Sequence, residues 1–472
     1  MRSPRRGAPD TSGRTLARNC HIREINRGRL SGSSSIGQTH FVPAGEECCA
    51  NLAETFSLEI TSLANGPDAL ARHGGRVVFV PGAAPGDRVR ARLVAEHKTY
   101  ARAQVTHRCA PGPAYREPPC SWAAECGGCP WQQVRYPAQL TAKTQNVRDA
   151  LARIACVGAR RELTIVAAPR EWGYRHRIRL HVGAGGRLGY KRPRSHEIVE
   201  VGACQVADPA ISAAIAPLRG VLQRLATRID SVELLTNGQG GVVAFAMTRD
   251  HWRTQDAGPI ARLLEHDSEL AGVRLRGTGW ELSWGNVSVL ISPDPARAPI
   301  TLHPGSFSQV NTEANQLLVR AVVAWAAGAA RVLDLFCGAG NLSLPFARAG
   351  ASVVGVDRDR GAIADAAASA AAAGIRDIRF EVLTADRFLR QQGVAGADLI
   401  VLDPPRAGAP SVATQLGRLR PRRILYVSCD PATMARDVRT LAAAGYAVDR
   451  VQPIDLFPQT EHVEILLEAV LS

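Results

Sequence analysis

The chain has 472 residues, of which 46% are hydrophobic, and this length predicts roughly two to four packed domains. No run of about 18 apolar residues occurs, so no membrane span is predicted, and the basic start lacks the apolar core of a secretory signal, so we expect a cytoplasmic protein. The formal net charge of +14 favours a polyanionic partner, nucleic acid first, although an arginine-rich genome would leave the same surplus.

Residues 1–53 are rich in Arg, Gly and Ser and lack hydrophobic periodicity, which predicts a disordered segment or a misassigned gene start. Three of the 11 cysteines lie there: Cys20, Cys48 and Cys49. An odd number of cysteines in a cytosolic chain indicates metal ligands, catalytic thiols or buried thiols rather than disulfides.

Residues 54–111 read as short strands separated by Gly/Pro turns, as in "GRVVFVPGAAPGDRVRARLVAEH" and "YARAQVTHRC". This pattern predicts a small antiparallel β-barrel. Such barrels often bind nucleic acid on one face, and a purely structural barrel fits the pattern equally well.

Residues 112–300 mix strands and helices and predict a central α+β domain. In "RHRIRLHVG" the apolar residues face one way, and three arginines face the other: Arg175, Arg177 and Arg179. Three arginines on one strand face form a surface for phosphates, and an ordinary solvated face is the alternative.

The same region carries "CSWAAECGGC", a C-x5-C-x2-C pattern formed by Cys120, Cys126 and Cys129, with Cys204 as a fourth candidate. Four thiolates could hold zinc or an iron–sulfur cluster, and the spacing alone does not choose. The pattern is not the C-x3-C-x2-C of radical enzymes, so radical chemistry is disfavoured. Three further cysteines are not expected to be ligands: Cys109, Cys156 and Cys337.

Residues 301–472 alternate apolar strands ("RVLDLFC", "SVVGVD", "DLIVLD", "RILYVSC") with Ala-rich helices, which predicts a Rossmann-like, mostly parallel, doubly wound sheet. In "VLDLFCGAGNLSLPFA", Gly338 and Gly340 let the backbone approach a ligand, and Asp357 at the next strand end can accept ribose hydroxyls. The loop lacks the P-loop pattern and the third glycine of dinucleotide folds. The combination is typical of S-adenosylmethionine methyltransferases.

Two further motifs lie where the following strands end. In "VLDPPRAG", Asp403 ends a strand, and Arg406 replaces the aromatic residue found in enzymes that methylate exocyclic amines. In "ILYVSCDPATMARD", Cys429 ends the next strand, at the same sheet edge. A thiolate added to C6 of a pyrimidine makes C5 able to take a methyl group, and a base must then remove the C5 proton. Glu464 is the candidate base, and His462 is predicted on the same strand face.

These motifs, with "FSQVN" at 307–311 and "DLFPQTEHVE", resemble the bacterial RNA uracil-5-methyltransferases in the order that family shows, over the last third of the chain. The resemblance implies Cys429 as nucleophile and Glu464 as base. It also implies contacts with S-adenosylmethionine from Gln309, Phe336, Asn341, Asp357 and Asp403, besides Gly338 of the turn. A further family contact falls near Thr384 or Asp386.

Residues 54–111 also resemble the TRAM domain, an RNA-binding module. Ribosomal members of the family carry this cysteine spacing with a [4Fe-4S] cluster, so the resemblance implies a structural cluster on Cys120, Cys126, Cys129 and Cys204. Barrel and cluster together imply the large-subunit ribosomal RNA type. "EWGYRHRIRLHV" and "LGYKRPRSHEIVEV" resemble the family's RNA-binding region, which implies RNA contacts from Arg175, Arg177, Arg179, Lys191 and Arg192.

Three alternatives stay open at this point. The substrate could be tRNA or two RNA sites, or the chain could be an iron–sulfur RNA-binding protein with an inactive methyltransferase domain. DNA cytosine methyltransferases typically place the nucleophile after a P-C pair, which is absent around Cys429. No obligate protein partner is predicted.

Overall fold

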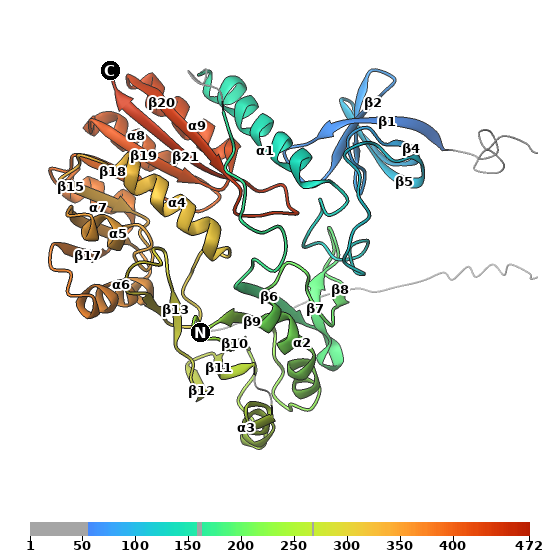
Figure 1. The fold of residues 1–472 in the computed structure, drawn as a ribbon, viewed down its shortest axis with the longest axis horizontal. Helices are drawn as coiled ribbons and strands as arrows, with labels where there is room; N and C mark the ends of the chain where they lie inside the picture. Colours follow the sequence, from blue (N-terminus) through green and yellow to red (C-terminus); the bar gives the residue numbers. More distant parts are fainter. Residues whose placement is uncertain (1–54, 158–162, 267–268) are drawn as a thin grey trace, which may run out of the picture. The chain divides into compact units, whose positions relative to one another are not determined.

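The computed structural model describes residues 55–157, 163–266 and 269–472, and the prediction made for residues 1–53 lies outside them (Figure 1). Five strands at its start close into a barrel in the order β1-β2-β3-β5-β4. Their bounds are β1 Phe56–Leu63, β2 Ala69–His73, β3 Arg76–Val80, β4 Arg88–Glu96 and β5 Tyr100–Ala110.

The barrel forms because alternate residues of its strands are apolar and because its Gly/Pro turn is closed by a buried acid. In β1, Leu58 and Ile60 point into the barrel core. Asp87 accepts backbone N–H bonds from Ala84 (2.9 Å) and Gly112 (2.7 Å). The predicted barrel is confirmed, with one difference: β3 and β5 pair in parallel.

A sheet of seven strands in the described chain, in the order β12-β11-β10-β9-β6-β7-β8, confirms the predicted central α+β domain. Strands β10 and β11 pair in parallel and the other neighbours pair antiparallel. The strands are β6 Arg177–Val182, β7 Leu188–Lys191, β8 Ile198–Glu200, β9 Ser231–Thr236, β10 Val242–Met247, β11 Leu270–Gly277 and β12 Trp280–Gly285. The helical segments are η2 Ala184–Gly186, α2 Pro209–Leu222, η3 Thr254–Asp256 and α3 Ala257–His266.

The two faces of the central sheet have different neighbours. Helices α2 and α3 bury Ile211 and Ile260 against one face. On the other face Phe245 packs against β13 (Val289–Ile291), β14 (Ile300–Leu302) and Leu344 of the last domain. The central sheet is therefore joined to the last domain by an apolar core.

The last domain is a sheet in the order β17-β16-β15-β18-β19-β21-β20, in which β21 runs antiparallel between β19 and β20. Its strands are β15 Arg331–Leu335, β16 Ser352–Asp357, β17 Ile378–Val382, β18 Leu399–Leu402, β19 Arg423–Ser428, β20 Tyr446–Ile454 and β21 Glu464–Leu471. Its helices are α4 Thr312–Trp325, α5 Ser343–Arg348, α6 Arg360–Ala372, α7 Ala385–Gln392, α8 Pro410–Leu419 and α9 Pro431–Ala443. The predicted doubly wound sheet is confirmed.

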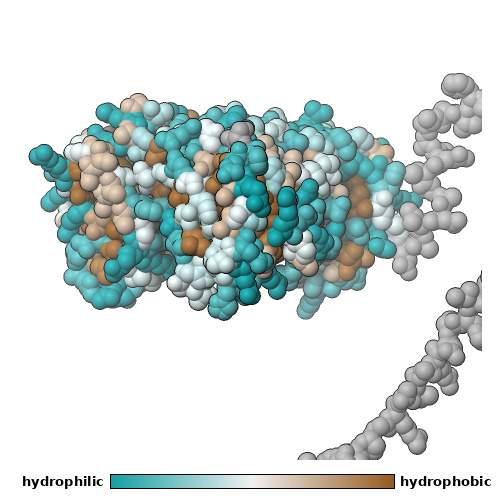
Figure 2. Space-filling view, turned by 90° about the horizontal axis from the view of Figure 1, so that it is seen from below, coloured by the Kyte–Doolittle hydropathy of each residue, from teal (hydrophilic) through white to brown (hydrophobic). Residues whose placement is uncertain are grey.

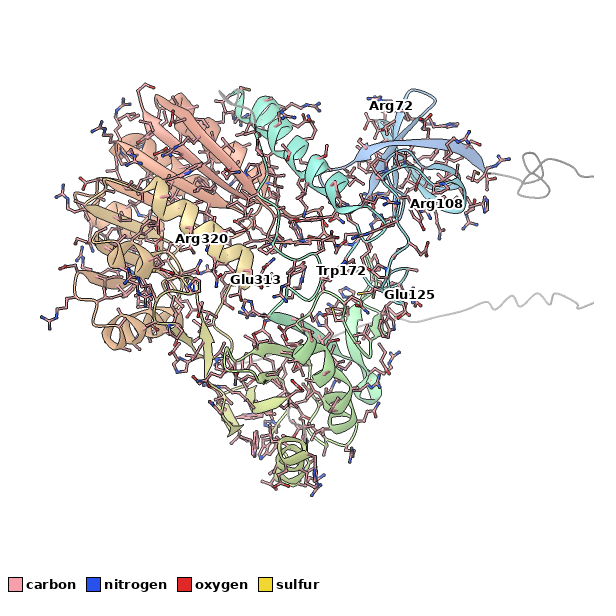
Figure 3. All side chains as sticks on the ribbon, in the orientation of Figure 1. Arg72, Arg108, Glu125, Trp172, Glu313 and Arg320 are labelled. Carbon is pink, nitrogen blue, oxygen red and sulfur yellow. The ribbon has the colours of Figure 1, made fainter. Side chains whose placement is uncertain are left out.

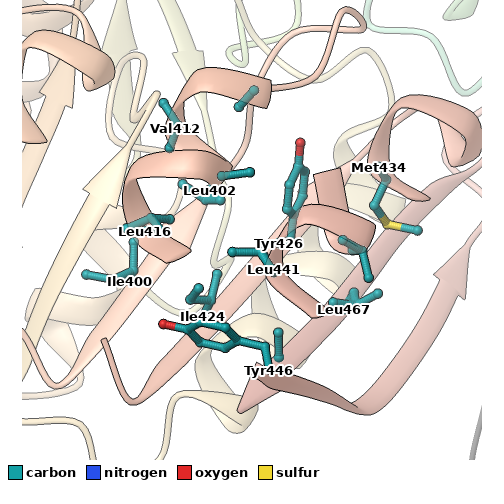
Figure 4. Close-up of a cluster of buried hydrophobic side chains, with 14 of the residues drawn as sticks. Ile400, Leu402, Val412, Leu416, Ile424, Tyr426, Met434, Leu441, Tyr446 and Leu467 are labelled. Carbon is teal, nitrogen blue, oxygen red and sulfur yellow. The ribbon is translucent and has the colours of Figure 1, made fainter. Parts of the chain in front are cut away.

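Strands such as β18 are apolar throughout because both faces of this sheet are covered. Val401 and its same-face neighbours pack with α4 and α5. Ile400 and Leu402 pack on the opposite face with Leu416 of α8 and Leu441 of α9 (Figure 4).

The helix that follows the cysteine segment belongs to this last domain by its packing. Helix α1 (Tyr136–Ala150) continues into a π-helical turn, η1 (Leu151–Ala155), and buries Val147 and Leu151 in the core that contains Leu335. The predicted boundaries of 112–300 and 301–472 therefore cut through a shared core. An apolar helix face predicts burial but does not tell which core it enters.

One ion pair fixes α1 to the loop of residues 455–463, which joins β20 to β21. Lys143 Nζ lies 2.7 Å from Asp455 Oδ1, and both side chains are fully buried. Lys143 also donates to the carbonyl oxygen of Phe457 (3.0 Å). Burial lowers the pKa of Lys143, and Asp455 opposes that effect. The 455–463 loop thus depends on an amine from a distant helix.

In the part of the chain that the structure describes, no helix is long and apolar enough to cross a membrane. The face drawn in Figure 2 carries mainly hydrophilic residues, with apolar ones scattered among them.

Replacing Lys143 by methionine should lower the free energy of unfolding by about 3–5 kcal/mol, because Asp455 would keep a buried charge without its partner. Urea unfolding followed by circular dichroism measures this loss. Arg153→Met is the control, since that side chain is 78% exposed in its pair with Asp149 and its loss should stay within about 0.5 kcal/mol. A Lys143→Met protein as stable as the unmodified chain would contradict this role.

Candidate active site

The carboxyl ends of four parallel strands meet at one edge of the last sheet and bring the predicted site residues together there. The glycine turn follows β15, Asp357 ends β16, Asp403 follows β18 and Cys429 follows β19. Because β21 is antiparallel to β19 and pairs Ile465 with Ser428, its first residue, Glu464, reaches the same edge.

The turn after β15 is shaped by its own backbone and by Asp357. The N–H groups of Phe336 and Cys337 both donate to the carbonyl oxygen of Val356 (2.9 and 3.1 Å), and Phe336 has a φ of 66°. A non-glycine residue with positive φ is uncommon and is often found at functional sites. Gly338 donates its N–H to Asp357 Oδ2 (3.0 Å), and a Cβ on Gly338 would face open space. The turn therefore leaves room for a ligand.

Several acidic side chains lie at this edge with few cationic side chains near them. Asp334 is fully buried, accepts a hydrogen bond from Ser343 on Oδ2, and has no partner for Oδ1. Burial raises its pKa to about 7, and Asp403 and Asp357 add to the effect. Loss of hydration also raises the pKa of Asp403 to about 7. A cationic ligand would relieve this repulsion.

Cys429 lies at the mouth of β19 because the chain reverses immediately after it. Asp430 caps α9 by accepting the N–H of Thr433 (2.8 Å), and Pro431 opens the helix. Burial raises the pKa of Cys429 to about 12, Glu464 and Asp403 raise it as well, and Arg406 lowers it. Without ligands the site therefore holds a protonated thiol.

Glu464 is 2% exposed, and its pKa is raised well above the ordinary value by burial and by Asp403, while Arg406 opposes the shift. His462 lies in the loop before β21, so the prediction that it shares a strand face with Glu464 is wrong. Its Nε2 lies 3.0 Å from Arg406 Nη2. Burial and Arg406 lower the pKa of His462 to about 4, so it is neutral at physiological pH.

The other predicted cofactor residues flank this edge. Asn341 exchanges two side-chain hydrogen bonds with Asn315 of α4 (2.8 and 3.0 Å), which ties the turn to that helix. Gln309 is half-buried just before α4. Thr384 follows β17 and caps α7, whereas the carboxylate of Asp386 is bound by Gln415 and Arg390.

Asp334, at this edge, and Phe307, in the segment before α4, were not selected individually from the sequence. Asp334 is the acid of "VLDLFCGAGNLSLPFA", so the glycine-turn motif already contained it. Phe307 opens "FSQVN" and is 67% exposed, which is unusual for a large apolar side chain.

All four candidate ligand cysteines line one pocket: Cys120, Cys126, Cys129 and Cys204. The N–H of Gly128 donates to Cys126 Sγ and the Tyr190 hydroxyl donates to Cys204 Sγ, both at 3.4 Å. Burial raises the pKa of Cys126 to about 11 and that of Cys129 to about 12. Over the described residues, no three His, Cys, Asp or Glu side chains lie close enough to hold a single metal ion.

The predicted arginine face of β6 is only partly formed. Arg175 precedes the strand and lines the cysteine pocket. Arg177 is largely buried and binds both carboxylate oxygens of Glu233 (2.8 and 2.7 Å), so it does not offer a free charge, whereas Arg179 is exposed. The sequence could not reveal Glu233, which lies on the neighbouring strand β9.

The hairpin β7–β8 carries the other predicted RNA contacts. Lys191 is exposed, and Arg192 pairs with Glu197 and with Glu125 of the cysteine segment (2.8 Å to Glu125; Figure 3 labels Glu125). The N–H of Gly127 donates to the carbonyl oxygen of Lys191 (3.1 Å). The cysteine segment therefore holds this hairpin.

The strand order, glycine turn and acids define a Rossmann-like, S-adenosylmethionine-dependent methyltransferase. Residues 136–470 match the family of tRNA (Uracil-5-)-methyltransferases, and residues 51–106 match the TRAM domain. The chain belongs to this family of RNA uracil-5-methyltransferases, and it is an enzyme that methylates C5 of uridine in RNA with S-adenosylmethionine.

Named relatives cover nearly the whole chain. The 23S rRNA (uracil(1939)-C(5))-methyltransferase RlmD of Shewanella amazonensis is 33% identical over 90% of this chain and 97% of its own. An uncharacterized RNA methyltransferase of Thermosynechococcus vestitus is 34% identical over 87% of this chain and 97% of its own. The tRNA (uracil-54, C5)-methyltransferase of Pyrococcus abyssi, solved with S-adenosyl-L-homocysteine, superposes with a TM-score of 0.69 and 25% identity, covering 88% of this chain and 100% of its own.

Alkylation of Cys429 in the ligand-free protein should rise about tenfold per pH unit between about pH 8 and 10, because a pKa near 12 makes the thiolate fraction follow pH. Arg406→Ala should slow it at every pH, since the guanidinium stabilises the thiolate. Iodoacetamide labelling with peptide mass spectrometry measures both effects. Cys109, exposed on the barrel, should not respond to the substitution, and an Arg406→Ala protein labelled faster at Cys429 would refute the role.

Proposed function

We propose that this enzyme methylates a uridine of large-subunit ribosomal RNA, with Cys429 as the nucleophile and Glu464 as the base. The observation that carries the proposal is the pairing of β19 with β21, which sets Cys429 and Glu464 beside each other at the edge that also holds Asp357 and Asp403. A thiol and a carboxyl group within electrostatic reach are the two groups that C5 methylation of a uracil requires.

The proposed reaction begins when Cys429 releases its proton to solvent and its sulfur bonds to C6 of the uracil, which leaves C5 with enolate character. S-adenosylmethionine would supply the methyl group as an electrophilic sulfonium and leave as the thioether S-adenosyl-L-homocysteine. Glu464 then takes the C5 proton, the C5–C6 double bond re-forms, and the C6–S bond breaks to release Cys429. Arg406, which lowers the pKa of Cys429, assists both the formation and the departure of the thiolate.

The residues present suit the cofactor. The unpartnered Oδ1 of Asp334 and the raised pKa values of Asp334 and Asp403 call for a cation. Asp357 uses one oxygen for Gly338 and the other for Asp359, and each keeps a lone pair for a ribose hydroxyl. We assign cofactor contacts to these acids and to the turn, with Gln309, Phe336, Gly338 and Asn341.

The choice of ribosomal RNA rests on the RlmD relative and on the barrel, and tRNA is the competing substrate because of the Pyrococcus abyssi relative. The target base must leave its stack to reach Cys429. The exposed ring of Phe307, two residues before Gln309, offers a surface on which a base could stack. Among the predicted RNA contacts, Arg179 and Lys191 are exposed and suited to phosphates.

The four-cysteine pocket is proposed to hold a [4Fe-4S] cluster with a structural role, bound by Cys120, Cys126, Cys129 and Cys204. Donors to sulfur from Gly128 and Tyr190 and the positive charge of Arg175 suit bound thiolates. The choice of a cluster over zinc rests on the resemblance of the cysteine spacing to that of the ribosomal members of the family.

A trapping experiment tests the reaction. Incubation with S-adenosylmethionine and ribosomal RNA containing 5-fluorouridine should give an RNA–protein adduct that survives a denaturing gel, because fluorine cannot leave C5 as a proton. Cys429→Ala should give no adduct and lose methylation by at least about 10³-fold while still binding the cofactor. Adduct formation only with tRNA would show that tRNA, not ribosomal RNA, is the substrate. No adduct with any RNA would reject the proposed chemistry.

Protein purified without oxygen should contain about four irons and four sulfides per chain, as the proposed cluster requires. Iron and acid-labile sulfide analysis with the absorption spectrum measures this. Cys129→Ser should lose the iron, whereas Cys109→Ser, outside the pocket, should keep it. Zinc without sulfide would overturn the cluster assignment.

A further inference from the structure

The 455–463 loop, which ends at Glu464, is held largely by segments outside its own sheet. Lys143 binds Asp455, and Asn311 Nδ2 donates to the carbonyl oxygen of Leu456 (3.2 Å). Gln459, at a φ of 69°, exchanges hydrogen bonds with Gln139 in both directions (2.9 Å each). A loop in this conformation depends on the groups that surround it.

One of these contacts leads directly to the cysteine pocket. The Tyr174 hydroxyl, in a side chain that is 2% exposed, donates to the carbonyl oxygen of Pro458 (2.9 Å) and accepts from Arg175 Nε (3.3 Å). Arg175 lines the cysteine pocket together with Cys129. Two consecutive side chains therefore connect the cysteine pocket to the loop that leads to Glu464.

A second connection runs through the backbone. Trp131 is fully buried two residues after Cys129, and its N–H donates to the carbonyl oxygen of Gln459 (3.1 Å). Both connections end on neighbouring residues of the same loop, Pro458 and Gln459. The cysteine segment thus fixes this loop at adjacent points.

We propose that Tyr174 and Arg175 are positioning residues that hold the 455–463 loop against the cysteine pocket so that Glu464 can take the C5 proton. This inference rests on the proposed function, in which Glu464 accepts that proton while the C5–C6 double bond re-forms and the C6–S bond returns its electrons to Cys429. Attack and methyl transfer use groups on the parallel strands, so a displaced loop slows the last step selectively.

Tyr174→Phe is the variant that tests the proposal, because it removes one hydroxyl and keeps the ring. In single turnover with unmodified uridine RNA, the covalent adduct should form at the normal rate and decay about tenfold more slowly, so that it accumulates on a denaturing gel. The Glu464→Gln protein, which lacks the proposed base, should show the slowest decay of the adduct. A role confined to stability would instead slow formation and decay alike.

Tyr446→Phe provides a matched control. The Tyr446 hydroxyl also donates to a proline carbonyl oxygen, that of Pro421 (2.6 Å), before the amino end of β19 and away from the 455–463 loop. Its loss should leave adduct decay unchanged. Unchanged decay in Tyr174→Phe, or equal slowing of formation and decay, would overturn the proposal.

Hydrogen exchange tests the contact between Tyr174 and the 455–463 loop independently of the methylation reaction. Amides of 455–463 should exchange roughly fivefold faster in Tyr174→Phe and in Cys129→Ser than in the unmodified protein or Tyr446→Phe. Arg175→Lys replaces Cys129→Ser if the latter does not fold. If the unmodified protein gives no adduct with 5-fluorouridine RNA, the proposed function fails, and hydrogen exchange alone then tests whether Tyr174 holds the 455–463 loop. Unchanged exchange in both variants would reject that contact as a constraint on the loop.

Discussion

The buried ion pair between Lys143 and Asp455 is the constraint around which the site is organised. Lys143 lies on α1, which follows the cysteine segment, and Asp455 opens the loop that ends at Glu464. Two charges with no exposure are tolerated only when each is matched, so the pair permits little displacement of the helix relative to the loop. Because α1 also shares its apolar core with the sheet that carries Cys429, the proposed base, Glu464, is placed by the same contacts that assemble the domain.

The electrostatics of the edge follow from how little positive charge it contains. Asp334 and Asp403 have pKa values of about 7 in the folded chain, against an ordinary value of 3.8. The folded state therefore holds protons that the unfolded chain has lost between about pH 4 and 7, and these two acids make the fold less stable as pH rises through that interval. A bound cation removes that cost, which couples cofactor binding to the release of protons and to a more acidic Cys429.

Local pattern predicted the parallel strands and therefore the edge at which Asp357, Asp403 and Cys429 meet, because the carboxyl ends of parallel strands converge whatever their order. It could not predict that β21 inserts antiparallel between β19 and β20, so Glu464 was a candidate base without a structural reason for its closeness to Cys429, and His462 was placed wrongly on the strand. The sequence also could not predict the partners of buried charged side chains, such as Glu233 for Arg177, because such ion pairs depend on which strands become neighbours.

The 455–463 loop also explains why residues far apart in sequence serve one reaction. Asn311, at the end of the "FSQVN" motif, binds Leu456 and caps α4, and it pairs through its backbone with Arg175. The segment that contains Gln309, a proposed cofactor contact, and the segment that lines the cysteine pocket therefore lie side by side and hold the same loop. Both segments bind the loop directly, at Leu456 and at Pro458, a few residues before Glu464. The loop is thus the point at which the segment of Gln309 and the cysteine pocket both contact the chain that leads to the proposed base, Glu464.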